Sequence, residues 1–498
     1  MGEALPARER KTSPFNMMTF SHRACLAAAV ATIGASVYGC RPTYSAPIEP
    51  ARARLIDARV QRLLEQYHTP GASVEVTTGG KVAYAAVFGQ RNVGRRLPAN
   101  LTTAYEIGSI TKQFTAAAIL QLQEAGKLDI DARLATYLPH APHASEVTLR
   151  QLLAHTSGMP EYFSCDSMPP STTPDALIGS IAGKPLDFTP GTRWRYSNTG
   201  YILLGRVIEV TSGESYNHYV RAHLLEPSDM TQTHTVADVP RIVDVSLGYL
   251  PTSGAAANGP ATPAPTLIDS YGWSAGNIVS TVGDLQKWNA ALAGGRIISA
   301  RSYELMRTSA TTSDGTVTNY GFGLFVDSLE DQPRIGHTGH SCGFAAEDEY
   351  FPRQDMRIVV LTNSVDGPAE SIVTVLLNSF FPEFAASADE PGVGEEPAMT
   401  ARIKALITPL LHGHVVRSEL TADENADLTD EAAKEFTKYG EPGAFVFKRK
   451  VDRPFGPVYI YWLKFGDDVQ RLVVQIERKT DKFNAIAFAT PSEFGAKR

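Results

Sequence analysis

A serine and a lysine stand three residues apart in the segment YEIGSITKQFTAAAILQLQEAG, residues 105–126. If this segment is a helix, Ser109 and Lys112 lie on the same face, one turn apart. A serine hydroxyl attacks a carbonyl carbon well only when a base removes its proton, and a neutral lysine amine can be that base. The reference pKa of lysine is about 10.4, so Lys112 must be desolvated or placed near other cations to be neutral. The apolar run that follows Lys112 favours such burial.

The same pair is also consistent with a helix cap followed by a solvated surface charge, which is the common meaning of this spacing taken alone. Two further segments favour a catalytic role for Ser109 and Lys112 over this structural one. RYSNTGY supplies Tyr196 and Asn198, and the strand-like IGHTGHSCG supplies His337, Thr338 and Gly339. The simpler alternatives for the first segment are a buried aromatic at Tyr196 and a turn former at Asn198.

These three pieces, in this order, resemble the serine β-lactamase and penicillin-binding protein superfamily. The Tyr-x-Asn form is similar to the branch of class C β-lactamases, D-Ala-D-Ala carboxypeptidases, D-aminopeptidases and esterases. Residues 152–162, 188–213 and 274–288 also resemble signature segments of that branch, and the resemblance covers roughly residues 52–384.

The resemblance implies a role for each side chain or backbone group of the site. Ser109 would be the acylated nucleophile, and Lys112 and Tyr196 would share the work of the general base. Asn198 would hydrogen-bond both Lys112 and the acyl amide of the substrate. The oxyanion hole would consist of the backbone N–H groups of Ser109 and His340, and such donors typically supply a few kcal/mol of transition-state stabilisation each.

The substrate-binding strand departs from the commonest pattern of the superfamily. Many β-lactamases have Lys-Thr-Gly where this chain has His337, Thr338 and Gly339. Histidine is mostly neutral near pH 7, so it would hold a substrate carboxylate less strongly than lysine. Superfamily members with His at this position include esterases and D-amino-acid peptidases. We therefore predict a serine hydrolase that acts on an ester or amide, with an esterase or D-amino-acid peptidase favoured.

Three other readings of the site remain open: a β-lactamase, a penicillin-binding or peptide-sensing protein with little turnover, and a scaffold with a vestigial site. The net charge of −7 offers no basic footprint for nucleic acid, so the expected partner is a small-molecule or peptide substrate. The chemistry needs no metal or organic cofactor. Cys165 and Cys342 could form one disulfide in an oxidising compartment or remain two separate thiols, and their spacing shows no metal pattern.

The predicted helices and strands form two domains, a large one that contains all the candidate site residues and a small one that follows it. Alternating runs around Gly79 and Gly80 predict a hairpin, a helical stretch follows, and strand-like runs return later. This pattern predicts an α/β fold of the α+β type over residues 47–384: an antiparallel sheet flanked by helices, with a helical insert. An acidic, Pro- and Gly-rich linker is expected at 385–398, and a small α+β accessory domain at 399–498.

Residues 1–46 are predicted to be a signal segment. An arginine-containing start at Met17 is followed by an Ala-rich apolar run. The run ends in VYGC, which resembles a lipoprotein cleavage box and would leave Cys40 as a lipidated first residue. Cleavage near Ala46 and a buried Ala-rich helix are the alternatives. We therefore expect an exported bacterial protein, either periplasmic or anchored to the membrane through Cys40.

Overall fold

The computed structural model divides the chain into two compact units, whose described residues, apart from Ala489, lie between 48 and 381 and between 392 and 488. The structure describes residues 48–161, 173–242, 244–250, 261–265, 269–329, 332–381, 392, 394–422, 424, 428–453, 456–465 and 468–489. The predicted signal segment with Cys40, the cysteine at 165 and most of the predicted linker lie outside these residues. Within them, no helix is both long and apolar enough to cross a membrane.

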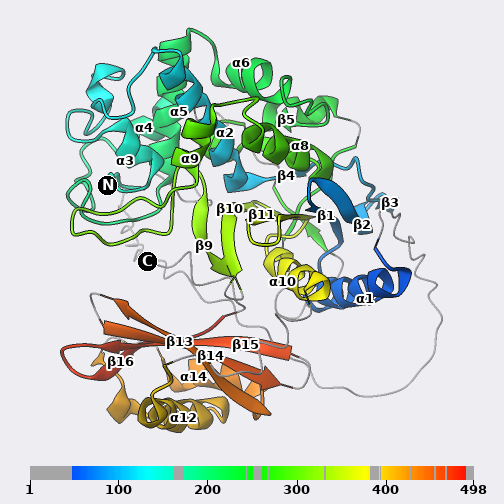
Figure 1. Ribbon diagram of the computed structural model, residues 1–498, viewed down its shortest axis with the longest axis vertical. Helices are drawn as coiled ribbons and strands as arrows, with labels where there is room; N and C mark the ends of the chain where they lie inside the picture. The colour runs from blue at the N-terminus through cyan, green and yellow to red at the C-terminus, as the bar shows by residue number, and fades with distance from the viewer. Residues whose placement is uncertain are drawn as a thin grey trace, which may run out of the picture. The chain divides into compact units, whose positions relative to one another are not determined.

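A seven-stranded sheet forms the centre of the larger unit (Figure 1). In spatial order its strands are β3 (Leu97–Pro98), β2 (Lys81–Asn92), β1 (Gly71–Thr78), β12 (Met356–Thr362), β11 (Phe344–Phe351), β10 (Gln332–Ser341) and β9 (Phe325–Leu329). All the neighbouring pairs are antiparallel. The N-terminal and C-terminal strands of this unit meet where β1 pairs with β12, and Ser73 lies opposite Leu361 there. The hairpin predicted between β1 and β2 is confirmed, because Gly79 and Gly80 both have positive φ.

The larger unit has helices on both faces of this sheet and further helices in the insert. They are α1 (Pro50–Gln66), α2 (Thr111–Glu124), α3 (Leu149–Leu153), α4 (Pro174–Gly179), α5 (Asn198–Ser212), α6 (Tyr216–Val220), α7 (Asp269–Gly276), α8 (Val282–Ala293), α9 (Ala300–Met306) and α10 (Ala369–Phe380). Short helical turns occur at η1 (Gly108–Ile110), η2 (Leu134–Thr136), η3 (Arg221–Leu225) and η4 (Val236–Arg241). The remaining strands are β4 (Tyr105–Glu106), β5 (His234–Thr235), β6 (Tyr249–Leu250), β7 (Thr262–Pro263) and β8 (Ile278–Ser280).

Successive side chains of a strand point to opposite faces, so β12 contributes to two separate hydrophobic clusters. Ile358 and Val360 pack with residues of α1 and α10 on one face. Val359 and Leu361 join residues of α2 and α8 on the other face. A strand buried on both sides reads as the nearly continuous apolar run seen in MRIVVLT. The predicted fold class, an antiparallel sheet flanked by helices with a largely helical insert, is confirmed.

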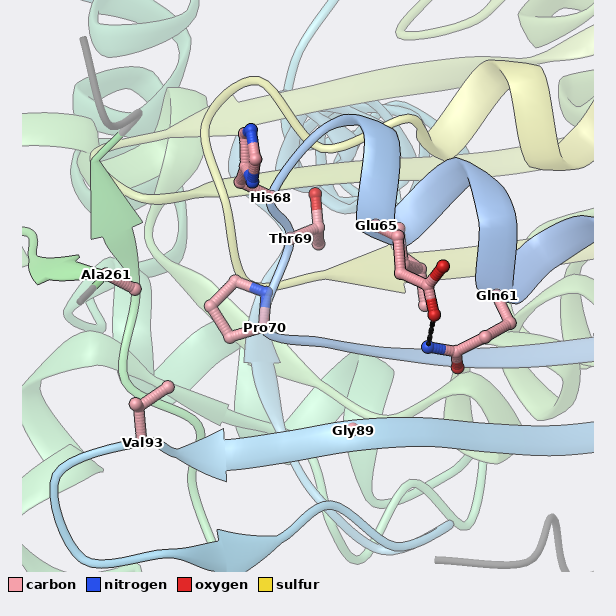
Figure 2. A pocket seen from close by; sticks show the side chains of 9 residues that line it. Gln61, Glu65, His68, Thr69, Pro70, Gly89, Val93 and Ala261 are labelled. Carbon is pink, nitrogen blue, oxygen red and sulfur yellow. Dashed lines mark hydrogen bonds between the residues drawn. The ribbon is translucent and has the colours of Figure 1, made fainter. Parts of the chain in front are cut away.

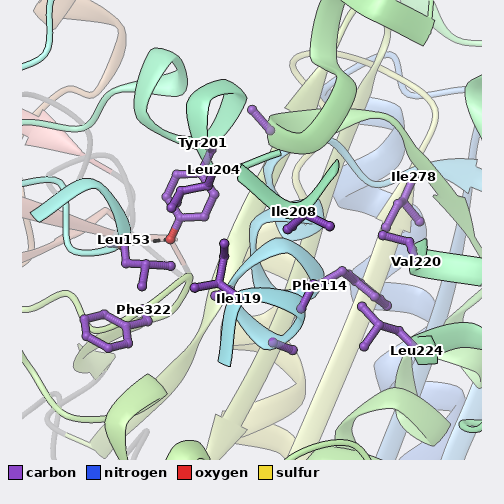
Figure 3. Packing of buried hydrophobic residues seen from close by; sticks show 14 of the residues in the cluster. Phe114, Ile119, Leu153, Tyr201, Leu204, Ile208, Val220, Leu224, Ile278 and Phe322 are labelled. Carbon is purple, nitrogen blue, oxygen red and sulfur yellow. Dashed lines mark hydrogen bonds between the residues drawn. The ribbon is translucent and has the colours of Figure 1, made fainter. Parts of the chain in front are cut away.

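Helix α2, which follows the candidate nucleophile, is buried on almost all of its faces. Phe114 stacks on Trp288 of α8 with the ring centroids 4.0 Å apart. Ile119 packs among the apolar residues of α5, including Leu204 and Ile208 (Figure 3). A helix anchored on several sides holds the residues of its first turn in fixed positions.

The smaller unit is a four-stranded sheet with helices packed on it. Its elements are α12 (Pro397–Leu411), η6 (Arg417–Glu419), α14 (Asp430–Lys434), η7 (Glu435–Lys438), β13 (Ala444–Arg453), β14 (Gly456–Phe465), β15 (Asp468–Glu477) and β16 (Lys482–Ala489), with the strands in sequence order. Ile403 and Ile407 of α12 pack with Tyr461 and Leu472 of the sheet. The aromatic residues of β14 therefore serve mainly as core.

Candidate active site

Ser109 lies in the turn η1, directly before α2. The preceding Gly108 has a φ of 50°, and a Cβ atom there would lie 2.4 Å from the carbonyl oxygen of His340. In the same way, a Cβ atom on Gly339 would lie 2.0 Å from the carbonyl oxygen of Ile107. Glycine at these two positions lets the nucleophile turn lie directly against the end of β10. The sequence thus places the Ser109 backbone beside the strand that would complete an oxyanion hole.

Lys112 is fully buried and its Nζ has three hydrogen-bond partners. It donates to Ser109 Oγ at 3.0 Å, to Asn198 Oδ1 at 2.8 Å and to the backbone oxygen of Ala275 at 2.9 Å. Burial lowers the pKa of Lys112 from 10.5 to about 7, and the negative charge of Glu161 partly opposes this change. A lysine with such a pKa is neutral in about half of the molecules at pH 7 and can then accept the Ser109 proton.

The half-buried Tyr196 lies next to this lysine. Lys112 Nζ is 4.8 Å from the centroid of the Tyr196 ring and 5.6 Å from that of Tyr201. The Tyr196 ring also packs against the His155 ring at 4.3 Å between centroids. His155 Nδ1 accepts the backbone N–H of Ser197 at 3.1 Å, and burial holds the pKa of His155 well below its usual value. A neutral His155 supports the loop that carries Tyr196.

Asn198 begins α5, and its backbone N–H donates to Glu161 Oε2 at 2.7 Å. A carboxylate at this place is favoured because the N-terminus of a helix carries partial positive charge. This hydrogen bond fixes the backbone of Asn198, and from that position its side-chain Oδ1 reaches Lys112.

His337 on β10 is buried, with 1% of its surface exposed. Its Nδ1 lies 2.6 Å from the Thr338 carbonyl oxygen, which can only accept, so Nδ1 carries the proton. Its Nε2 lies 2.9 Å from the Tyr320 hydroxyl and accepts from it. Burial, together with the nearby charge of Lys112, lowers the pKa of His337 to about 3, so the imidazole is neutral at pH 7. Both ring nitrogens thus bond within the protein.

The structure brings three of the predicted site residues into direct contact: Ser109, Lys112 and Asn198. Tyr196 lies beside them, and β10 runs past the nucleophile turn. On that strand Thr338 is half-buried, Gly339 is buried, and the side chain of His340 is exposed. His337 points its ring into the aromatic cluster behind the strand, where it packs against Tyr320, Phe325 and Tyr196.

Three groups of the site were not found from the sequence: the Glu161 carboxylate, the Tyr320 hydroxyl and the Ala275 carbonyl. Glu161 lies within the segment 152–162, which carries part of the resemblance. Its place in that segment is the one signal in the sequence that could indicate a carboxylate near the site. No sequence pattern indicates that Tyr320 meets His337, because that contact depends on tertiary packing.

A separate hollow of about 380 Å³ lies between the last turn of α1 and the start of β1 (Figure 2). Gln61, Glu65, His68, Thr69 and Val93 are among its lining residues, and none of the catalytic candidates lines it. Among the described residues, no group of three or more His, Cys, Asp or Glu side chains is placed to hold a metal ion.

Comparison with known proteins gives a family match over most of the larger unit. A family model described as Beta-lactamase matches residues 56–377. PbpX of Bacillus subtilis (strain 168), a penicillin-binding protein by name, is 30% identical over 269 residues. That alignment covers 54% of this chain and 65% of the relative, so the chain spans about two thirds of the length of that protein.

Two solved structures are also similar. The octameric penicillin-binding protein homologue from Pyrococcus abyssi is 25% identical, with a TM-score of 0.59, over 88% of this chain and 98% of that chain. A D-stereospecific amidohydrolase from Streptomyces sp. is 26% identical, with a TM-score of 0.55, over 68% of this chain and 99% of that chain.

Proposed function

Because this chain belongs to the beta-lactamase family and is a serine hydrolase, we propose that it cleaves an ester or amide through an acyl-enzyme formed at Ser109. One observation carries the proposal: the Nζ of a buried lysine lies 3.0 Å from Ser109 Oγ. A general base must lie within hydrogen-bond reach of the proton it removes and have a pKa near the working pH. With a pKa of about 7, Lys112 meets both conditions.

In the first half of the proposed reaction, neutral Lys112 accepts the hydroxyl proton of Ser109 while Oγ bonds to the carbonyl carbon of the substrate. The π electron pair of the carbonyl moves to its oxygen. The backbone N–H groups of Ser109 and His340 stabilise this oxyanion. When the tetrahedral intermediate collapses, the bond to the alcohol or amine breaks, and Lys112 or Tyr196 returns the proton to that leaving group.

In the second half, water replaces the leaving group. The same pair, Lys112 and Tyr196, takes one proton from the water molecule as its oxygen bonds to the acyl carbon. Collapse of the second tetrahedral intermediate breaks the bond to Ser109 Oγ, which regains a proton from the pair. The products are the free acid and the unmodified enzyme.

The substrates that we favour are esters and D-amino-acid amides or peptides. A neutral His337, bonded to Tyr320 and Thr338, places no positive charge on β10 that could pair with a substrate carboxylate. The similar Streptomyces protein is named a D-stereospecific amidohydrolase, which supports an amide of a D-amino acid. A second candidate is a penicillin-binding protein that acylates but turns over slowly, and the names of PbpX and of the Pyrococcus homologue favour it.

We also propose that the protein is exported and held at the membrane through Cys40. The support for this proposal is the sequence alone, in the Ala-rich run that ends in VYGC.

A substrate panel tests the proposed function. Wild type and Ser109→Ala are assayed with p-nitrophenyl esters, D-amino-acid amides, D-Ala-D-Ala peptides and nitrocefin. We expect ester or D-amide turnover by wild type alone. Fast nitrocefin hydrolysis would contradict the substrate preference, and a stable penicillin adduct without turnover would favour the second candidate. Equal activity of Ser109→Ala would refute the acyl-enzyme at this residue.

A further inference from the structure

The carboxylate of Glu161 is linked to the candidate base through two hydrogen bonds. Its Oε2 accepts the backbone N–H of Asn198 at 2.7 Å, and Oδ1 of the same asparagine accepts from Lys112 Nζ at 2.8 Å. Because Asn198 is the first residue of α5, a helix of 15 residues, its N–H has no acceptor one turn earlier in the helix. The Glu161 carboxylate supplies that acceptor.

The charge of Glu161 also acts on Lys112 directly. Tyr196 and Tyr201 present their ring faces to this lysine. His155 and His337 are near enough for the lysine charge to help lower their pKa values, and both are neutral near pH 7. Among the residues that the structure describes, Glu161 is the acidic group whose charge favours the protonated lysine against burial. The balance between burial and the Glu161 carboxylate therefore affects how far Lys112 is protonated.

We propose that Glu161 is a positioning residue for the general base: its carboxylate fixes Asn198 against Lys112, and its charge sets the fraction of Lys112 that is neutral. This inference rests on the proposed function, because it assigns a partner to the base of that reaction. It concerns Glu161 alone and leaves the roles of Ser109 and Tyr196 unchanged.

Two substitutions separate the two effects of Glu161. In Glu161→Gln, the amide oxygen still accepts the Asn198 N–H but the negative charge is gone. The negative charge that stabilises protonated Lys112 is then gone, so the pKa of Lys112 falls and the base becomes neutral at lower pH. In Glu161→Ala, both the charge and the acceptor are lost, so Asn198 is also no longer held.

The measurement is the second-order rate constant for fluorophosphonate labelling of Ser109 between pH 5 and 10, which requires no knowledge of the natural substrate. In wild type we expect the rate to rise through a midpoint near the pKa of Lys112, about 7. For Glu161→Gln we expect the midpoint about 0.5 to 1 pH unit lower, with a plateau within about twofold of wild type. For Glu161→Ala we expect the same displacement and a plateau lower by about tenfold.

Controls distinguish a failure of this inference from a failure of the proposed function. Glu304→Gln neutralises an exposed carboxylate of α9 that pairs with Arg307, and its profile should match wild type. An unchanged midpoint in Glu161→Gln, or one displaced to higher pH, would overturn the role of Glu161 while the labelling itself stands. Absence of labelling in folded wild type at every pH would refute the acyl-enzyme, and this inference with it. Because Glu161→Gln preserves the acceptor, the test does not depend on whether Glu161→Ala folds.

Discussion

Lys112→Met should abolish acylation and change how the stability of the protein depends on pH. The unfolded chain binds a proton on Lys112 below about pH 10.5, whereas the folded protein does so only below about pH 7. Between these values the unfolded state binds more protons, so the free energy of unfolding rises with pH. The difference between 10.5 and about 7, at about 1.4 kcal/mol per pH unit, corresponds to about 5 kcal/mol.

The methionine side chain does not titrate in the folded or the unfolded protein, so the variant lacks this part of the pH dependence of stability. It does lose three hydrogen bonds and leaves the oxygens of Asn198 and Ala275 without their donor, at about 1–3 kcal/mol each. At pH 7 the two effects oppose each other, and we expect the free energies of unfolding of the variant and of wild type to agree to within about 2 kcal/mol. Near pH 10 the wild type should be the more stable protein by several kcal/mol.

The assay is urea unfolding of both proteins at several pH values from 6.5 to 10. The quantity of interest is wild-type stability minus variant stability, because other groups that titrate in this range cancel in the difference. We expect this difference to rise by up to about 1.4 kcal/mol per pH unit. A difference that stays flat across the range would show that Lys112 is not a buried base with a lowered pKa, and the reasoning would fail.

Two further substitutions follow from the geometry, and a third follows from the sequence. Gly108→Ala places a Cβ atom 2.4 Å from the His340 carbonyl oxygen at a φ of 50°, so it should cost about 2 kcal/mol or more in urea unfolding and greatly slow labelling of the nucleophile; wild-type stability would contradict the packing described. Tyr320→Phe leaves the buried Nε2 of His337 without its donor and should cost about 1–2 kcal/mol by the same assay, whereas an unchanged midpoint would show that this bond contributes little. Cys40→Ser should move the protein from the membrane fraction to the soluble fraction of the expressing cell; unchanged fractionation would argue against lipidation.

The sequence predicts most of what is local. The period-two runs around Gly79 and Gly80 predict the hairpin, and the apolar run of β12 is typical of a strand buried on both faces. The spacing of Ser109 and Lys112 predicts that they share a helix face, and in the structure their side chains are hydrogen-bonded. These features depend on neighbours within a few residues, which a single sequence displays.

The rest depends on contacts between distant segments. Asn198 is 86 positions from Lys112, and the Ala275 carbonyl is 163 positions away, so no local pattern indicates that all three meet. The neutral state of His337 could be expected from its residue type. That both its nitrogens bond within the protein follows only from the packing of Tyr320 behind β10. The charge of Glu161 acts on Lys112 only because the loop after α3 is folded over the start of α5.

The central claim is a covalent intermediate on one serine. Wild type and Ser109→Ala are each mixed with a p-nitrophenyl ester of a D-amino acid, quenched with acid within milliseconds to seconds, and digested for mass spectrometry. The account predicts an acyl group on the peptide that contains Ser109 in wild type, with its formation rate rising toward pH 7 and above, and no acyl group in the variant. Hydrolysis without any adduct at Ser109, or with equal turnover by Ser109→Ala, would contradict it.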